Sequence, residues 1–132
     1  MNYLLDTHTL IWAIKDPKKL SSTAIQVVQN ADNSIFISAI TFWEIALKFS
    51  IGKLELRNIL PDEFPGISLQ LGFQLISISP DESASQYKLP VTNHKDPFDR
   101  MLVWQAISRN LTLISKDDRM LLYVDAGLKV LW

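Results

Sequence analysis

Short apolar runs alternate with amphipathic segments along the whole chain. The runs that have the length and composition of buried strands are 2–6, 34–38, 73–78, 111–115 and 129–132. Between them apolar residues recur at helical spacing, which predicts helices over 7–14, about 22–31, 40–51, a stretch after Ser79, 97–109 and 118–123. Strands that alternate with helices predict an α/β fold, a three-layer α/β/α sandwich around a central, mainly parallel sheet.

Local signals mark where several of these helices begin. Ser79 and Glu82 stand at the two ends of a capping box that has a proline at the first helical position. Asp96 directly precedes Pro97, which predicts that the Asp96 side chain caps the helix that follows. The segment 61–66 contains two prolines and a glycine, so the helix expected there is weak.

The composition is that of one globular domain, which we expect to span residues 1–132. Of these residues, 48% are hydrophobic and 20% are charged. The absence of cysteine excludes a disulfide framework and any thiolate metal site. No apolar run approaches the roughly 20 residues of a membrane-spanning helix, and the N-terminal segment does not have the pattern of a signal peptide. We therefore expect a cytoplasmic protein.

Two carboxylates stand beside or within apolar segments. Asp6 follows the apolar run 3–5, so its side chain either belongs to a turn or projects from the carboxyl edge of a central strand. Glu44 lies with Thr41 and Lys48 on one polar stripe of an otherwise apolar helix. Either this stripe is a solvent face with a Glu44–Lys48 pair, or it is buried, and the carboxylate then needs a charged partner or a metal.

Further carboxylates stand at the starts of helices. Asp99 shares the core-facing side of its helix with Leu102, whereas Gln105 lies toward the other side. In the first turn, the helix dipole favours the negative charge of Asp99. Asp117 and Asp118 follow a strand, and we expect one of them to cap the next helix and the other to point toward the strand ends.

These acids suggest a metal site. The candidate ligands are Asp6, Glu44, Asp99 and one of the pair Asp117 and Asp118. In one cavity they would repel one another unless a cation lay between them, and Mg²⁺ and Mn²⁺ prefer such oxygen ligands. His8 and His94 are isolated in the sequence, and we expect both to be structural. The net charge of −1 is unlike that of a nucleic-acid-binding protein, but bound divalent ions would make it positive.

Four motifs in a fixed order identify a family. They are LLDTHTLIW at 4–12, SAITFWEIA at 38–46, HKDPFDRML at 94–102 and LISKD at 113–117. On these motifs the chain resembles the PIN-domain family, and within it the VapC-like toxins of toxin–antitoxin pairs. The resemblance implies an α/β/α fold and an endoribonuclease, dependent on Mg²⁺ or Mn²⁺, that hydrolyses phosphodiester bonds in RNA.

The resemblance also implies roles for single residues and for partners. The family's acidic site falls on Asp6, Glu44, Asp99 and Asp117, and its supporting hydroxyl positions fall on Thr7 and Ser115. A homodimer and a cognate antitoxin that covers the site are implied as well. Large apolar side chains that serve either the core or such a dimer are Trp12, Phe42, Trp43, Phe49 and Trp104. Basic residues near the motifs are Lys48, Arg100 and Lys116.

Two other interpretations of the sequence start from the same residues. A phosphoaspartyl phosphatase or a receiver-like domain also places an Asp after its first strand, but it uses a further acid near that residue, and position 8 is a histidine. A non-catalytic PIN-like protein would only bind a partner. Cleavage of RNA that EDTA abolishes separates the predicted nuclease from this non-catalytic protein.

Overall fold

The computed structural model describes all of residues 1–132 and is built around a five-stranded sheet. The strands are β1 (Asn2–Leu5), β2 (Ser34–Ser38), β3 (Gln74–Ile76), β4 (Thr112–Ile114) and β5 (Lys129–Leu131). Their order is β3-β2-β1-β4-β5, and each neighbouring pair is parallel. The α/β class and the parallel sheet predicted from the sequence are confirmed.

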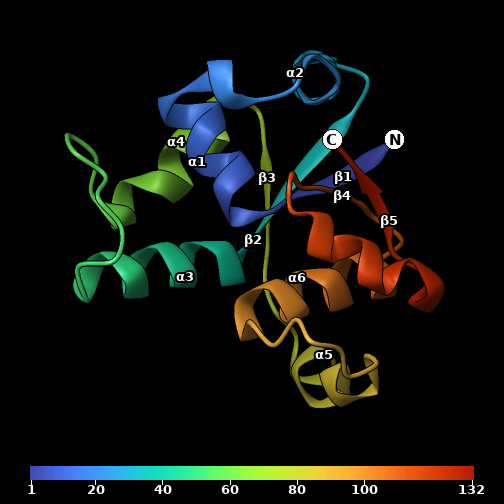
Figure 1. Ribbon diagram of the computed structural model, residues 1–132. Helices are drawn as coiled ribbons and strands as arrows, with labels where there is room; N and C mark the ends of the chain where they lie inside the picture. The colour runs from blue at the N-terminus through green and yellow to red at the C-terminus, as the bar shows by residue number, and fades with distance from the viewer.

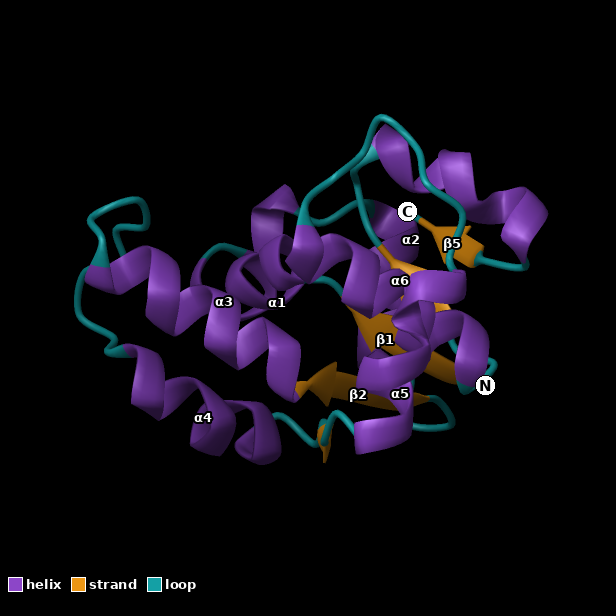
Figure 2. Ribbon diagram, turned by 90° about the horizontal axis from the view of Figure 1, so that it is seen from below, coloured by secondary structure: helices purple, strands orange, loops and turns teal.

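Helices connect the strands and cover both faces of the sheet (Figures 1 and 2). The α-helices are α1 (Thr7–Lys15), α2 (Ser22–Gln29), α3 (Ala39–Ser50), α4 (Phe64–Gln70), α5 (Pro80–Ser85) and α6 (Pro97–Ser108). Short 3-10 helices are η1 (Pro17–Lys19), η2 (Pro61–Glu63) and η3 (Gln86–Lys88), and a longer one, η4 (Asp118–Ala126), precedes β5. None of the helices has the length and apolar character needed to cross a membrane.

Alternation along the strands divides the core into two layers, because successive strand side chains point to opposite faces. Tyr3 and Leu5 of β1 pack in one buried cluster with residues of α1, α2 and α4. Leu4 packs in the other cluster with α6 and η4, where Leu102 and Tyr123 are fully buried. The expected three-layer arrangement is therefore present, with α1, α2 and α4 on one face and α5, α6 and η4 on the other.

The segment that looked weakest in the sequence is helical. After the short η2, the chain continues as α4, with Pro65 in its first turn. A proline is accepted there because the backbone N–H that it lacks would have no partner within the helix. Phe64, the first residue of α4, is fully buried in the core and holds the helix against the sheet.

The order of the strands creates a switch point beside β1. From β1 the chain adds β2 and then β3 on one side, and it later adds β4 and β5 on the other. Parallel sheets of this kind leave a crevice at the carboxyl ends of the strands where the order reverses. Here that edge lies between Leu5 and Ile114, which are paired across β1 and β4.

Candidate active site

Asp6 lies at this switch point, directly after β1. Its backbone N–H donates to the carbonyl of Ile114 (3.2 Å), which extends the pairing with β4. Its carboxylate accepts from the backbone N–H of Thr9 (2.9 Å) and so caps α1. Asp6 is only 5% exposed. Burial raises the pKa of its carboxyl, although the nearby hydroxyls of Ser115 and Thr9 act in the opposite direction.

Glu44 comes from α3 and is buried, with 2% of its surface exposed. The hydroxyl of Thr7 donates to Glu44 Oε1 (2.5 Å), and the Lys48 ammonium forms an ion pair with Oε2 one turn along the helix. Burial works to lower the pKa of Lys48, but the hydrogen bond and the charge of Glu44 outweigh it, so the pKa is raised. Both features considered from the sequence, the Glu44–Lys48 pair and the burial of Glu44, are therefore present together.

Asp99 lies in the first turn of α6, three residues after Asp96, which caps the helix. The predicted cap is confirmed: the Asp96 carboxylate accepts from the backbone N–H of Asp99 (3.0 Å). The Asp99 side chain is 17% exposed. Burial and then the charge of Asp96 raise the pKa of Asp99 to about 6, with a further contribution from Glu44, whereas the hydrogen bond with His94 lowers it.

His94, which stands alone in the sequence, forms a buried contact with Asp99 that the sequence analysis did not predict. Its Nε2 lies 2.9 Å from Asp99 Oδ2, and its side chain is fully buried. The other ring nitrogen, Nδ1, is buried without a hydrogen-bond partner. His94 lies in the loop before α6, where no helical or strand periodicity indicates which side chains are buried. Only its place two residues before the DPFD sequence could have pointed to the contact with Asp99.

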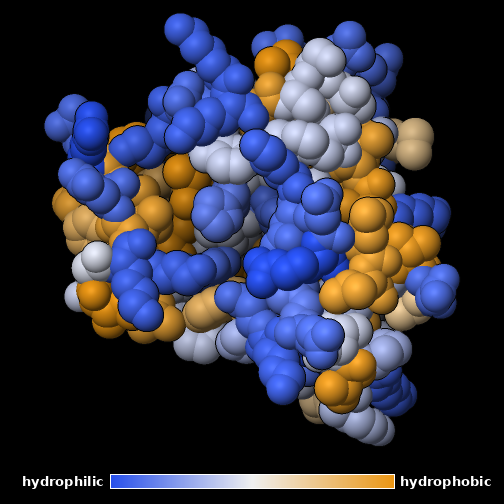
Figure 3. Space-filling model, in the orientation of Figure 1, coloured by the Kyte–Doolittle hydropathy of each residue, from blue (hydrophilic) through white to orange (hydrophobic).

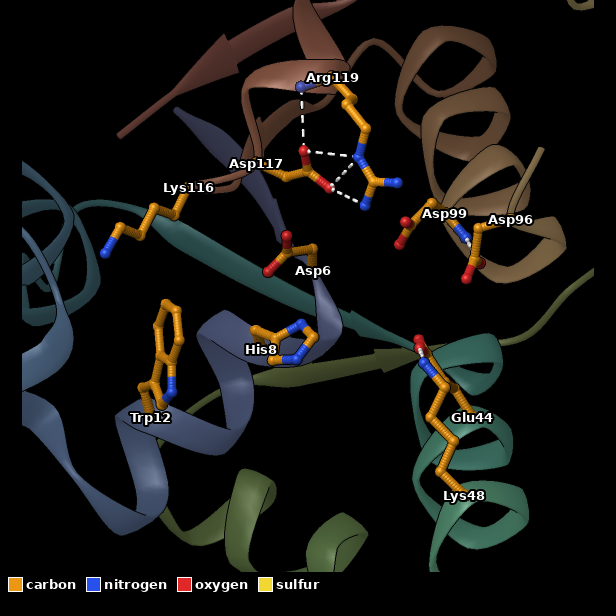
Figure 4. A pocket seen from close by; sticks show the side chains of 10 residues that line it. All are labelled: Asp6, His8, Trp12, Glu44, Lys48, Asp96, Asp99, Lys116, Asp117 and Arg119. Carbon is orange, nitrogen blue, oxygen red and sulfur yellow. Dashed lines mark hydrogen bonds and ion pairs between the residues drawn. The ribbon is translucent and has the colours of Figure 1, made fainter. Parts of the chain in front are cut away.

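Asp117 combines the two roles that the sequence analysis divided between neighbours. It caps η4 by accepting from the backbone N–H of Arg119 (2.9 Å), and it also faces the strand ends (Figure 4). The Arg119 guanidinium, 2.7 Å from Oδ2, lowers the pKa of Asp117. Ser115 accepts from the backbone N–H of Asp117 (3.1 Å), which fixes the turn after β4. Asp118 is exposed and lies outside the acidic cleft defined below.

These side chains surround one hollow of about 340 Å³, which we call the acidic cleft. Its lining residues are Asp6, His8, Trp12, Glu44, Lys48, Asp96, Asp99, Lys116, Asp117 and Arg119. Figure 3 shows a depression in the middle of this face, bordered mainly by hydrophilic residues. All four predicted site acids, and Asp96 besides them, therefore lie around one space that Lys48, Lys116 and Arg119 also line (Figure 4).

Of the basic residues near the motifs, Arg100 does not reach the acidic cleft. Its guanidinium donates to the carbonyls of Leu89 and Pro90 and to the hydroxyl of Tyr123, so it ties α6 to the preceding loop and to η4. Arg119, which does line the cleft, was missed because only the geometry of the η4 cap brings it back onto Asp117.

The donors in the cleft suit a hard divalent cation. Five carboxylates face three basic side chains, so the cleft is short of positive charge. The raised pKa values of Asp6 and Asp99 also indicate a shortage of positive charge, because the folded chain alone does not stabilise both negative charges. One ligand atom from each of His94, Asp99 and Asp117 lies within 4.8 Å of the others, and Asp99 and Asp117 of this group line the cleft. Oxygen-rich sets of this kind hold Mg²⁺ or Mn²⁺.

Comparison with known proteins agrees with the motifs. The chain is 29% identical over 117 residues to Ribonuclease VapC22 of Mycobacterium tuberculosis, covering 89% of this chain and 88% of that protein. In fold it resembles VapBC2 from Rickettsia felis bound to a DNA fragment from its promoter (TM-score 0.67, 19% identity, 99% of this chain and 98% of that one). A toxin–antitoxin complex from Klebsiella pneumoniae is also similar (TM-score 0.59, 22% identity, 98% and 96%). The PIN domain profile matches residues 3–126, so the chain belongs to the PIN domain family.

Proposed function

We propose that this protein is an endoribonuclease that uses Mg²⁺ or Mn²⁺ to hydrolyse phosphodiester bonds in RNA, as the toxin of a toxin–antitoxin pair. The observation that carries the proposal is the convergence of Asp6, Glu44, Asp99 and Asp117 on one cleft at the switch point of a PIN-family sheet. The relative named Ribonuclease VapC22 supports the choice of RNA.

In this proposal the four acids hold the cation and other polar groups keep them in place. A divalent cation bound to such a site lowers the pKa of a water molecule and neutralises charge on a phosphate. Thr7 holds the Glu44 carboxylate through its hydroxyl. Ser115 fixes the turn that presents Asp117. Hydrogen-bonded groups behind a ligand fix its orientation in this way.

The three basic side chains at the cleft have a separate role. Lys48 partly neutralises Glu44 before any ion is bound. Lys116 and Arg119 are exposed at the rim of the cleft, where a substrate phosphate can reach them (Figure 4). They supply the attraction to RNA that the acidic net charge of the chain does not.

The surroundings of Asp6 do not favour the phosphoaspartyl alternative. The Asp6 carboxylate caps α1 by accepting from the backbone N–H of Thr9, and it faces the other acids of the cleft. The acids around it come from other elements, not from the positions next to it in the chain. A protein that only binds a partner has no use for four acids at one sheet edge, since they oppose folding when no cation is present.

Two partners belong to the proposal. An antitoxin is supported by the similar structures described as toxin–antitoxin complexes. A homodimer is supported by apolar residues left exposed along and just after α3, namely Trp43, Leu47, Phe49 and Ile51. Of the other aromatic residues considered for an interface, Trp12, Phe42 and Trp104 pack against the two core clusters.

The nuclease is tested with two matched aspartate variants. Asp99→Asn keeps the shape of the side chain but removes the anionic oxygen that a hard cation requires, so we expect no detectable cleavage of RNA with Mg²⁺ or Mn²⁺. Asp118→Asn makes the same chemical change at an exposed aspartate outside the cleft and should cleave as the parent does. EDTA should stop the parent protein and added Mn²⁺ should restore it. Cleavage by Asp99→Asn at the parental rate would contradict the proposed site.

A further inference from the structure

A second cavity adjoins the acidic cleft. It has a volume of about 580 Å³ and lies between α1, η1 and the segment after α3. His8 and Trp12 line both cavities, so their rings form the boundary between the two. The other residues around it are Ile11, Lys15, Asp16, Lys19, Leu54, Glu55 and Arg57. We call it the side cavity.

The charge of the side cavity is opposite to that of the acidic cleft. Lys15, Lys19 and Arg57 face two acids there, whereas the acidic cleft has five acids and three basic groups. None of these three basic residues forms an ion pair within the chain. Their charges are therefore available to an anion that binds in the side cavity. The neighbouring acidic cleft, in contrast, is short of positive charge.

Trp12 is the apolar residue of the acidic cleft, and it is half-buried. Its ring packs against His8 at 5.8 Å between centroids and against the edge of Trp132 at 5.9 Å. The Lys116 ammonium lies 5.9 Å from the ring centre, at the outer limit of a cation–π contact. This contact is therefore weak.

We propose that the side cavity and Trp12 form a subsite for a nucleotide next to the scissile bond. The proposal rests on the proposed ribonuclease function and adds a binding site for the neighbouring part of the RNA strand. One base stacks on Trp12, and the adjoining phosphate pairs with Lys15 and Lys19 in the side cavity. Stacking on an aromatic ring beside a basic groove is how proteins hold single strands without reading their sequence.

A single strand fits this arrangement better than a duplex does. Bases in a duplex are stacked on each other, and their faces are closed to a protein ring, whereas an unpaired base offers its face. The Trp12 ring lies between the basic residues of the side cavity and the proposed metal site. This order of aromatic and charged groups matches an RNA strand, in which bases alternate with phosphates.

The test measures binding of fluorescein-labelled single-stranded oligoribonucleotides of increasing length by anisotropy. All proteins carry Asp99→Asn, so that the RNA stays intact, and Mg²⁺ is present. We expect affinity to rise as nucleotides are added beyond the acidic cleft. Trp12→Leu should lose this gain, with binding to the longer RNAs weakened by about ten-fold or more. Trp12→Phe keeps an aromatic face and should retain most of it.

A charge-matched pair tests the side cavity. Lys19→Gln removes a basic group of the cavity, whereas Lys18→Gln removes the charge of its exposed neighbour in η1, which does not line it. Lys19→Gln should weaken binding and lower its dependence on salt concentration, and Lys18→Gln should not. The same RNA annealed to its complement should bind the parent more weakly than the single strand does.

Two negative results have different meanings. If the Asp99→Asn protein binds RNA and the Trp12→Leu and Lys19→Gln changes leave both affinity and its length dependence unchanged, the subsite is wrong and the ribonuclease proposal stands. If the protein without substitutions neither binds nor cleaves any RNA, the proposed function fails and the subsite fails with it. Preferred binding of duplex over single strand would also overturn the subsite.

Discussion

Asp99 lies where the polypeptide alone supports a negative charge poorly. It is largely buried, and Asp96 and Glu44 are close enough to raise its pKa further, whereas the hydrogen bond and the charge of His94 lower it. Burial also raises the pKa of Asp6, which lies across the cleft. Side chains kept in such surroundings are typical of sites that bind a charged ligand.

A stability measurement follows from the position of Asp99. In the folded, metal-free protein its pKa is about 6 instead of the ordinary 3.8, so the folded state binds this proton more tightly than the unfolded state does. The stabilisation due to the neutral form is complete below about pH 4 and is lost as the pH rises through about 6. We therefore expect Asp99→Asn to be more stable than the parent at pH 7, by up to about 3 kcal/mol, and equal to it near pH 4.

Chemical denaturation in EDTA at several pH values measures this difference. Asp118→Asn again serves as the control, because its side chain is exposed and outside the cleft. A structural aspartate would behave in the opposite way, and loss of a cap or an ion pair would lower the stability at pH 7 by about 0.5–2 kcal/mol. A less stable Asp99→Asn protein would therefore assign Asp99 a structural role.

At the scale of elements, α5 and α6 are joined by a buried polar network. Gln105 of α6 is fully buried and contacts Ser38 of β2 (2.5 Å) and Glu82 of α5 (3.3 Å). The Arg109 guanidinium donates to both oxygens of Glu82, at 2.6 and 2.7 Å. Hydrogen bonding from Arg109 lowers the pKa of Glu82 to about 2. The network therefore holds α5 against the outer side of α6 with charge-assisted bonds.

Glu82→Gln should reveal this stabilisation and its dependence on pH. The folded-state pKa of about 2 lies below the ordinary 4.5, so the stabilisation is fully present above about pH 4.5 and is lost as the pH falls through about 2. At pH 7 we expect the variant to be less stable by about 1.5–3 kcal/mol, the usual contribution of a hydrogen bond to a charged group. Asp81→Asn, at the exposed neighbour in α5, should change stability little. An equal loss of stability in both variants would show that the negative charge of Glu82 acts only through the helix dipole of α5 and not through its hydrogen bonds with Arg109.

The sequence predicted most of these elements because their signals are local. The capping box at Ser79 is present, and the strand and helix limits agree within a few residues. Gln105 was placed on the wrong side because helical spacing shows which residues share a face and not which faces a second helix will cover. His94 could not be placed either, since a loop has no period. The convergence of the four acids followed from strand ends and from the family motifs, but the salt bridge to Arg119 depends on the cap of η4.

At the scale of the whole molecule, the exposed apolar residues of α3 indicate a partner. Trp43 is 60% exposed and its ring packs only edge-on against Phe98. We expect a dimer at micromolar concentration in solution, and Trp43→Glu should shift it toward monomer because a charge cannot be buried there without a partner. Sedimentation of both proteins measures this, with Tyr87→Glu, also exposed but on η3, as the control. A parent protein that sediments as a monomer would contradict the dimer.

The position of β1 between the two parts of the sheet has a consequence for how the protein can be divided. Asp6 and Glu44 come from the part that builds β1, β2 and β3, whereas Asp99 and Asp117 come from the part that ends in β4 and β5. Between these parts the chain runs through 90–96, which has no helix or strand, and Val91 there is 87% exposed. Two fragments separated after Val91 would each hold half of the acids and no complete site. Cleavage of RNA by a mixture of the fragments, and by neither alone, would then report directly that β4 has docked beside β1.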